Sequence, residues 1–230
     1  MLSEAVSEAI RLFVNFDPDF SSAVRTSLVV AACSTLLSAG FGIPVGFVIG
    51  ISNFKGKRVL TIILNTLMAL PTVVIGLIGY SFLSRSGPFG RFGLLFTPAA
   101  MVLGQWILAM PIVAGLSLAA TESIDKRAWN TALSLGSGSI RASWMMLCEG
   151  RCAYLAAVVA GFGRVFGEVG ISLMLGGNIK YYTRTMTTTI ALETSKGEFG
   201  LGLALGSILL LVALAVNFSF QVLQGKVERP

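Results

Sequence analysis

Five long apolar stretches dominate the chain and are separated by shorter polar segments. A helix needs about 20 mainly apolar residues to cross a lipid bilayer, and each stretch reaches that length. The stretches are residues 23–51, 59–83, 98–120, 152–175 and 199–223. No internal repeat or low-complexity linker interrupts them. The pattern predicts an all-α membrane protein with about five transmembrane helices in a single domain, residues 1–230.

The first residues show a different pattern, with apolar side chains at helical spacing. The apolar positions are Leu2, Val6, Ala9, Ile10 and Phe13, and Ser3, Glu4, Glu8 and Arg11 lie opposite them. Because Glu4 and Glu8 stand where a cleavable signal peptide has basic residues, we do not interpret the segment as a signal. It predicts an interfacial helix over about residues 3–16 on the outer leaflet.

The distribution of basic residues predicts the orientation, because cytoplasmic loops carry an excess of Lys and Arg. Nine such residues fall on one side of the predicted membrane: Lys55, Lys57, Arg58, Lys126, Arg127, Arg141, Arg151, Lys226 and Arg229. Six fall on the other side: Arg11, Arg85, Arg91, Lys180, Arg184 and Lys196. We therefore expect the N-terminus outside and the C-terminus in the cytoplasm.

Composition agrees with a lipid environment and excludes several classes of protein. Apolar residues make up 54% of the chain and charged residues 12%, against about 25% charged in soluble domains. With three cysteines and no histidine, we expect no metal site, and an intramembrane enzyme would lack its usual catalytic groups. The net charge of +6 does not indicate a nucleic-acid partner, because the basic residues punctuate apolar runs instead of forming one patch.

The longest inner connection, residues 121–151, reads as two short helices separated by residues 136–139. Apolar side chains form a partial stripe on the first helix and line one face of the second, where Ser139 is a candidate N-cap. The stripe residues are Trp129, Ala132, Leu133 and Leu135 in the first helix, and Ile140, Trp144 and Leu147 in the second. Two interpretations stay open: a loop packed on its own membrane helices, or an exposed patch that a partner covers.

Two charged residues lie near the middle of the fourth apolar stretch. Arg164 and Glu168 are four residues apart, and a lone charge at this depth costs about 2.5–3.5 kcal/mol on insertion scales. We expect the two side chains to face each other. They either form a neutralised pair that orders the helices or help an anion along a pathway.

Prolines and threonines supply further candidates. Pro71 and Pro111 fall within the second and third stretches, where they mark either hinges beside a pathway or ordinary kinks. Hydroxyls recur at Thr183, Thr185, Thr187, Thr188 and Thr189. This run suits hydrogen bonding to an oxyanion or the lining of an outer gate, and it equally suits a polar outer loop.

Residues 130–136, followed by Ile140, resemble the cytoplasmic "EAA" loop of ABC importer permeases, which docks on an ATPase subunit. Ala132 and Gly136 fit that loop, whereas Asn130 stands where the family has Glu, Thr131 where it has Ala, and Cys148 where it has Pro. The resemblance implies a coupling role for Asn130, Thr131, Ala132, Leu133, Ser134, Leu135, Gly136, Ser137 and Ser139.

Other segments are similar to molybdate- and tungstate-type permeases. These segments are residues 70–77, 84–90, 119–125 and 163–179, and residues 183–197 look most like the tungstate branch. The resemblance implies a type I ABC importer permease (MetI-like) fold in a prokaryotic plasma (inner) membrane. It suggests that the pathway involves Pro71, Thr72, Pro111, Arg164, Glu168, Thr183, Arg184 and Thr185.

The resemblance also implies the activity and the partners. We expect import of a tetrahedral oxyanion, with tungstate first and molybdate or sulfate as alternatives. The implied partners are a second copy of the chain, a cytoplasmic ABC ATPase dimer, an external oxyanion-binding protein and membrane lipid. The chain contains no G-x-x-x-x-G-K-[ST] phosphate loop, so ATP and Mg²⁺ are expected on the partner ATPase. A secondary transporter or channel acting alone is the rival class, but the paired repeats that it predicts are missing.

Overall fold

The computed structural model describes residues 18–228, and over this range the chain is helical without strands. The elements are α2 (Pro18–Ile51), α3 (Lys57–Met68), α4 (Thr72–Leu83), the 3-10 helix η1 (Gly90–Phe92), α5 (Pro98–Ser123), α6 (Lys126–Ser134), α7 (Ser139–Glu149), α8 (Arg151–Phe166), α9 (Gly170–Gly176), α10 (Met186–Ser195) and α11 (Phe199–Glu228). The predicted interfacial helix over residues 3–16 lies outside the described residues.

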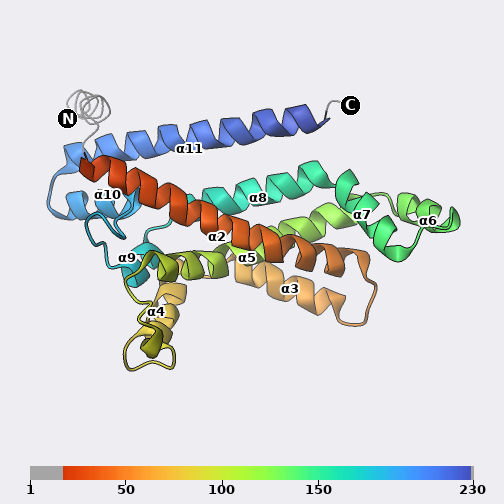
Figure 1. Ribbon diagram of the computed structural model, residues 1–230, viewed down its shortest axis with the longest axis horizontal. Coiled ribbons are helices and arrows are strands. Elements are labelled where there is room, and N and C mark those ends of the chain that lie inside the picture. Colours follow the sequence, from red (N-terminus) through yellow and green to blue (C-terminus); the bar gives the residue numbers. More distant parts are fainter. Residues whose placement is uncertain (1–17, 229–230) are drawn as a thin grey trace.

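The long helices share one direction and form an elongated bundle (Figure 1). α2 begins at one end of the long axis, beside α10, and α11 ends at the other (Figure 1). The short helices α6 and α7 cap that other end, while α4 projects sideways from the bundle (Figure 1). The chain therefore has two distinct ends, each made of short helices.

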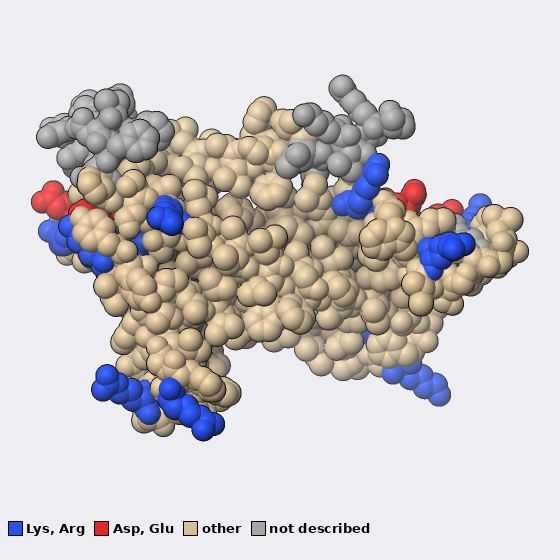
Figure 2. Space-filling model, in the orientation of Figure 1, with Lys and Arg blue, Asp and Glu red and all other residues tan. Residues whose placement is uncertain are grey.

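Within residues 18–228, three helices are long and apolar enough to cross a membrane by themselves: α2, α5 and the Phe199–Val222 part of α11. Two bent pairs pass the same test when each pair counts as one span, which gives up to five crossings. Figure 2 shows Lys and Arg at the two ends of the long axis and at the tip of the α4 projection, with none across the middle of this face. This distribution suits a hydrocarbon layer around the middle of the bundle.

The second predicted crossing, residues 59–83, is not one straight helix. α3 and α4 meet at 92°, and the turn lies at residues 69–71. Pro71 has extended backbone geometry (φ −65°, ψ 126°), and a proline disfavours the helical region for the residue before it. Pro71 therefore separates two helices and does not interrupt one.

The fourth predicted crossing, residues 152–175, is wrong in its outer part. α8 ends at Phe166 and α9 begins at Gly170, so residues 167–169, called the break segment below, lie between two helices. Glu168 is in the break segment and not in the middle of a continuous helix. Its carboxylate accepts a hydrogen bond from the Ile171 backbone N–H at 3.2 Å, which replaces a bond that a continuous helix would have made.

Close contact between α2 and α5 forms the centre of the bundle. Gly42, Gly46 and Gly50 recur every fourth residue along the α2 face that meets α5. A Cβ atom at Gly46 would come within 2.3 Å of the Ala114 carbonyl oxygen. Small residues at this spacing let membrane helices approach closely. Pro111 is buried within α5, which continues through it from Pro98 to Ser123.

Candidate functional site

A buried carboxylate holds the break segment together. Arg164 Nη1 donates to Glu168 Oε2 at 3.0 Å, and the Glu168 side chain is 4% exposed while that of Arg164 is 39% exposed. The prediction that these two side chains face each other is confirmed. Since Glu168 Oε1 also accepts the Ile171 N–H, the carboxylate both neutralises Arg164 and caps α9.

A line of hydrogen bonds ties the break segment to four helices, α10, α9, α5 and α2. The Glu168 carbonyl accepts from Thr187 Oγ1 at 2.9 Å and from Ser172 Oγ at 3.2 Å. Ser172 Oγ in turn accepts from Gln105 Nε2 at 3.3 Å, and Ser34 Oγ lies 3.2 Å from Gln105 Oε1. Because these groups are buried, breaking one bond would leave a polar atom without a partner.

Sequence reasoning missed Gln105 as a member of this line. A side-chain amide inside the apolar stretch of residues 98–120 is itself a signal, because polar groups at membrane depth require partners. The signal identifies the residue but not its partners Ser34 and Ser172, which lie 71 and 67 positions away in the chain.

Thr72, which directly follows Pro71, lies beside the same break, whereas Pro111 is buried within α5. A Cβ atom added to Gly170 would stand 3.3 Å from both Glu168 Oε1 and Thr72 Oγ1. The first turn of α4 therefore faces the buried carboxylate. The predicted pathway residues Pro71, Thr72, Arg164 and Glu168 form one cluster.

The threonine run is not the polar outer loop that the sequence also allowed. Residues 186–195 form α10, and Thr185 and Thr188 make a capping box at its start. Thr183 is buried, donates to the Gly176 carbonyl and accepts from the Ile179 N–H. Thr185 Oγ1 lies 2.9 Å from Thr187 Oγ1. These hydroxyls bond within the chain, and oxyanion binding by Thr183 and Thr185 stays a prediction.

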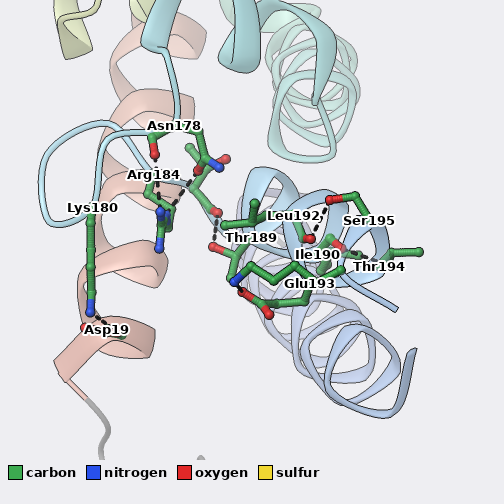
Figure 3. A network of polar contacts seen from close by, with 12 residues as sticks. Asp19, Asn178, Lys180, Arg184, Thr189, Ile190, Leu192, Glu193, Thr194 and Ser195 are labelled. Carbon is green, nitrogen blue, oxygen red and sulfur yellow. Dashed lines mark hydrogen bonds and ion pairs between the residues drawn. The ribbon is translucent and has the colours of Figure 1, made fainter. Parts of the chain in front are cut away.

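Arg184 belongs to a separate polar network between the start of α2 and the segment before α10 (Figure 3). Its Nε donates to Asn178 Oδ1 at 3.2 Å, and Lys180 Nζ pairs with Asp19 Oδ2 at 2.6 Å. The hydrogen bond to Asp19 raises the pKa of Lys180. A cavity of about 140 Å³ beside Asp19, Arg184 and Glu193 is lined by both signs of charge.

At the other end, the predicted pair of short helices is confirmed as α6 and α7. Gly136 has φ +81°, as expected for the residue that ends the first helix. The expected Ser139 cap is wrong, because Gly138 is the N-cap residue and makes no side-chain bond. Asp125 instead caps α6 by accepting from the Arg127 N–H at 2.9 Å.

The apolar stripe of this segment divides into two parts. Trp129 and Leu147 pack against a cluster of Phe47, Ala120, Met146 and Tyr154. In contrast, Leu135, Ile140 and Trp144 are 83%, 89% and 68% exposed. The side chains of Asn130 and Ala132 are not described. Of the other predicted coupling residues, Ser137 is half-buried, and Thr131, Leu133, Ser134, Gly136 and Ser139 are exposed.

The fold defines the class of protein. A chain of the MetNI methionine ABC transporter, solved in inward-facing conformations, matches this structure with a TM-score of 0.77 at 16% identity, over 92% of this chain and 97% of that one. The chain therefore has the MetI-like fold of ABC importer permeases, as the sequence implied.

Residues 42–229 match the family described as binding-protein-dependent transport system inner membrane component, and the chain belongs to that family. It is 41% identical to the tungstate uptake system permease protein TupB of Campylobacter jejuni, over 94% of this chain and 90% of that protein. It is 35% identical to the protein of the same name from Peptoclostridium acidaminophilum, over 97% and 98%. The chain is thus an inner-membrane permease of the ABC importer type.

Proposed function

We propose that this permease imports tungstate. Identity of 41% over nearly the full length of a relative named for tungstate uptake carries the proposal. Molybdate and sulfate are the alternative cargoes, since they share the tetrahedral shape and the double negative charge. A stand-alone channel is disfavoured by energetics. An inside-negative potential opposes anion entry by about 2.3 kcal/mol per charge per 100 mV, roughly 4.6 kcal/mol for a dianion.

The proposed assembly contains two copies of this chain, a cytoplasmic ATPase dimer that holds ATP and Mg²⁺, and an external oxyanion-binding protein. Leu135, Ile140 and Trp144 support the ATPase contact, because three large apolar side chains at the bundle end would otherwise face water. α6 and α7 then lie on the cytoplasmic side. With five crossings, the N-terminus is outside and the C-terminus inside.

The break segment is the proposed point of anion passage. Arg164 is half-exposed and attracts a dianion, while the buried Glu168 holds one side of the guanidinium. A guanidinium that is already paired binds an anion less tightly than a free one and releases it more readily. In this proposal, ATP binding and hydrolysis move the two copies between outward-open and inward-open states. Residues 131–139 transmit the movement of the ATPase subunits to the membrane helices.

Uptake in vesicles tests the proposal. Vesicles contain the chain with its ATPase and binding protein, and tungstate uptake is measured with molybdate and sulfate as competitors. We expect tungstate uptake that requires ATP and both partners. Molybdate and sulfate should inhibit this uptake less than an equal excess of unlabelled tungstate. Gly136→Asp should lower the ATP-driven uptake, while Gly138→Asp, where φ is −67°, should retain it. Uptake by the chain alone would exclude the importer function and favour a secondary transporter or channel.

A further inference from the structure

A groove of about 450 Å³ lies between α8 and α11. Small residues of α8 form one wall, at Ala156, Ala160 and Gly163, and the amide side chains of Asn217 and Gln221 stand on the α11 wall. Phe220 also lines the groove, and its ring packs against Phe162 with ring centroids 6.2 Å apart. The short side chains keep the space between the two helices open.

The two amides are unusual because of their depth. Both lie in the Phe199–Val222 segment that is apolar enough to cross a membrane. Asn217 follows Phe199 by 18 residues, about 27 Å of helix, and Gln221 follows it by 22 residues, about 33 Å. Counted from Phe199, Asn217 lies near the inner edge of a hydrocarbon core of roughly 30 Å, and Gln221 lies just beyond that edge. Both side chains are exposed, and neither makes a hydrogen bond to another described side chain or backbone group. An unpaired amide facing lipid is costly, so Asn217 in particular requires water or a polar ligand as its partner.

Charge favours an anion as that ligand. None of the described residues that line the groove is Asp or Glu. Gly163, which lines the groove, directly precedes Arg164 in α8, so this end of the groove lies next to the backbone of Arg164, whose side chain is half-exposed. An amide NH₂ group donates two hydrogen bonds without carrying charge. The groove thus runs from a cation to two neutral donors.

We propose that this groove is the inner half of the oxyanion pathway, taking the anion from Arg164 past Asn217 to Gln221 and the cytoplasmic side. The inference rests on the proposed function for the cargo and the direction. Neutral donors replace part of the hydration of the oxyanion without holding it strongly, which suits the step after it leaves Arg164. The width left by Ala156, Ala160 and Gly163 admits the anion together with water.

Uptake by two variants tests the route. Asn217→Leu and Gln221→Leu are each assayed in vesicles with the ATPase and the binding protein. We expect tungstate uptake to fall about tenfold in each variant. The amount of ATPase that co-purifies with the chain and the affinity for the binding protein should stay unchanged. Asn217→Gln, which restores a donor, should recover most of the rate. Ser207→Ala is the control, because the Ser207 hydroxyl bonds to its own helix at Leu203 O.

Cysteine labelling gives a second readout that does not depend on transport rate. In a chain with Cys33, Cys148 and Cys152 replaced by Ser, we expect Asn217→Cys and Gln221→Cys to react with a charged thiol reagent from the inner side. Tungstate should slow the reaction, and Ser219→Cys, two residues from each amide and therefore on the opposite face of α11, should stay unlabelled. If Asn217→Cys forms a crosslink between two copies and is not labelled by the reagent, residue 217 lies in a helix contact between the copies, and the proposed pathway is wrong.

The two possible failures are distinct. If the unmodified complex does not take up tungstate, the proposed function is wrong. If it does, but both leucine variants transport at the normal rate and tungstate gives no protection, the proposed function stands and the groove is not the route.

Discussion

The two ends of the membrane bundle use their side chains in opposite ways. In the break segment and the helices around it, buried polar groups bond to one another: Arg164 with Glu168, and Thr187 and Ser172 with the Glu168 carbonyl. In the segment of α6 and α7, two large apolar side chains, Ile140 and Trp144, are left exposed. The first region satisfies its polar groups within one chain, whereas the second leaves apolar surface uncovered.

This difference separates stability from association. Substitutions in the break segment should first destabilise the chain itself, because each buried polar group there depends on a partner. Substitutions at exposed positions of α7 should leave the chain folded and weaken a contact with another subunit. The predictions below test whether the two effects separate in this way.

The largest effect is expected for Glu168→Leu. The change leaves Arg164 without its partner and the Ile171 N–H without its acceptor. Losing one member of a buried pair costs about 3–5 kcal/mol, and we expect the lower end because Arg164 can reach water. The measurement is the Tm of the protein purified in detergent.

The double variant Arg164→Leu with Glu168→Leu is the matched control. It removes both charges, so its Tm should lie above that of Glu168→Leu. If the double variant is less stable than the single one, the carboxylate acts mainly through α9 and not through Arg164.

The second prediction concerns binding of the ATPase subunit. Ile140→Ala and Trp144→Ala together should weaken its association by about 2 kcal/mol, roughly 30-fold. The Tm of the isolated chain should change by no more than about 1 °C, because both side chains are exposed. Affinity is measured with the purified ATPase, and Leu36→Ala, exposed on α2, is the control. An equal loss of affinity in Leu36→Ala would contradict a specific contact.

The sequence predicted the helical membrane class and the ends of the long helices well, because long apolar runs constrain both. Residues 98–120, for example, correspond to α5 at Pro98–Ser123. It predicted a hinge or a kink at Pro71 but not that one helix ends and another begins there, and it did not predict the break at residues 167–169. Glu168 was recognised as a charge within an apolar stretch, but the break depends on the contacts of Glu168 with Ile171 and Thr187. The Arg164–Glu168 pair was accessible from spacing alone, whereas the Ser34–Gln105–Ser172 line requires tertiary contacts.

The third prediction addresses the turn between α6 and α7. Gly136 has φ +81°, and a Cβ atom there would meet nothing within 4 Å. Gly136→Ala therefore costs only the strain of a left-handed backbone, about 1 kcal/mol, and should lower ATPase affinity about fivefold. Gly138→Ala is the matched control, since Gly138 has φ −67° and equally open surroundings. Equal effects at both glycines would mean that turn geometry does not control docking.

The smallest effect is expected at the outer end, where Asp19 pairs with Lys180. Both side chains are about half exposed, and exposed ion pairs contribute little and are screened by salt. Asp19→Asn should lower the Tm by about 1 °C in low salt and by nothing measurable in about 1 M salt. Since the pair raises the pKa of Lys180, its contribution is fully present below the unfolded-state pKa of about 10.4. It is lost only as pH rises through the higher folded-state value, so the difference between Asp19→Asn and the unmodified chain should be constant from about pH 6 to 8. A Tm decrease above about 5 °C, or one that persists in high salt, would show that this end carries stability comparable to the break segment.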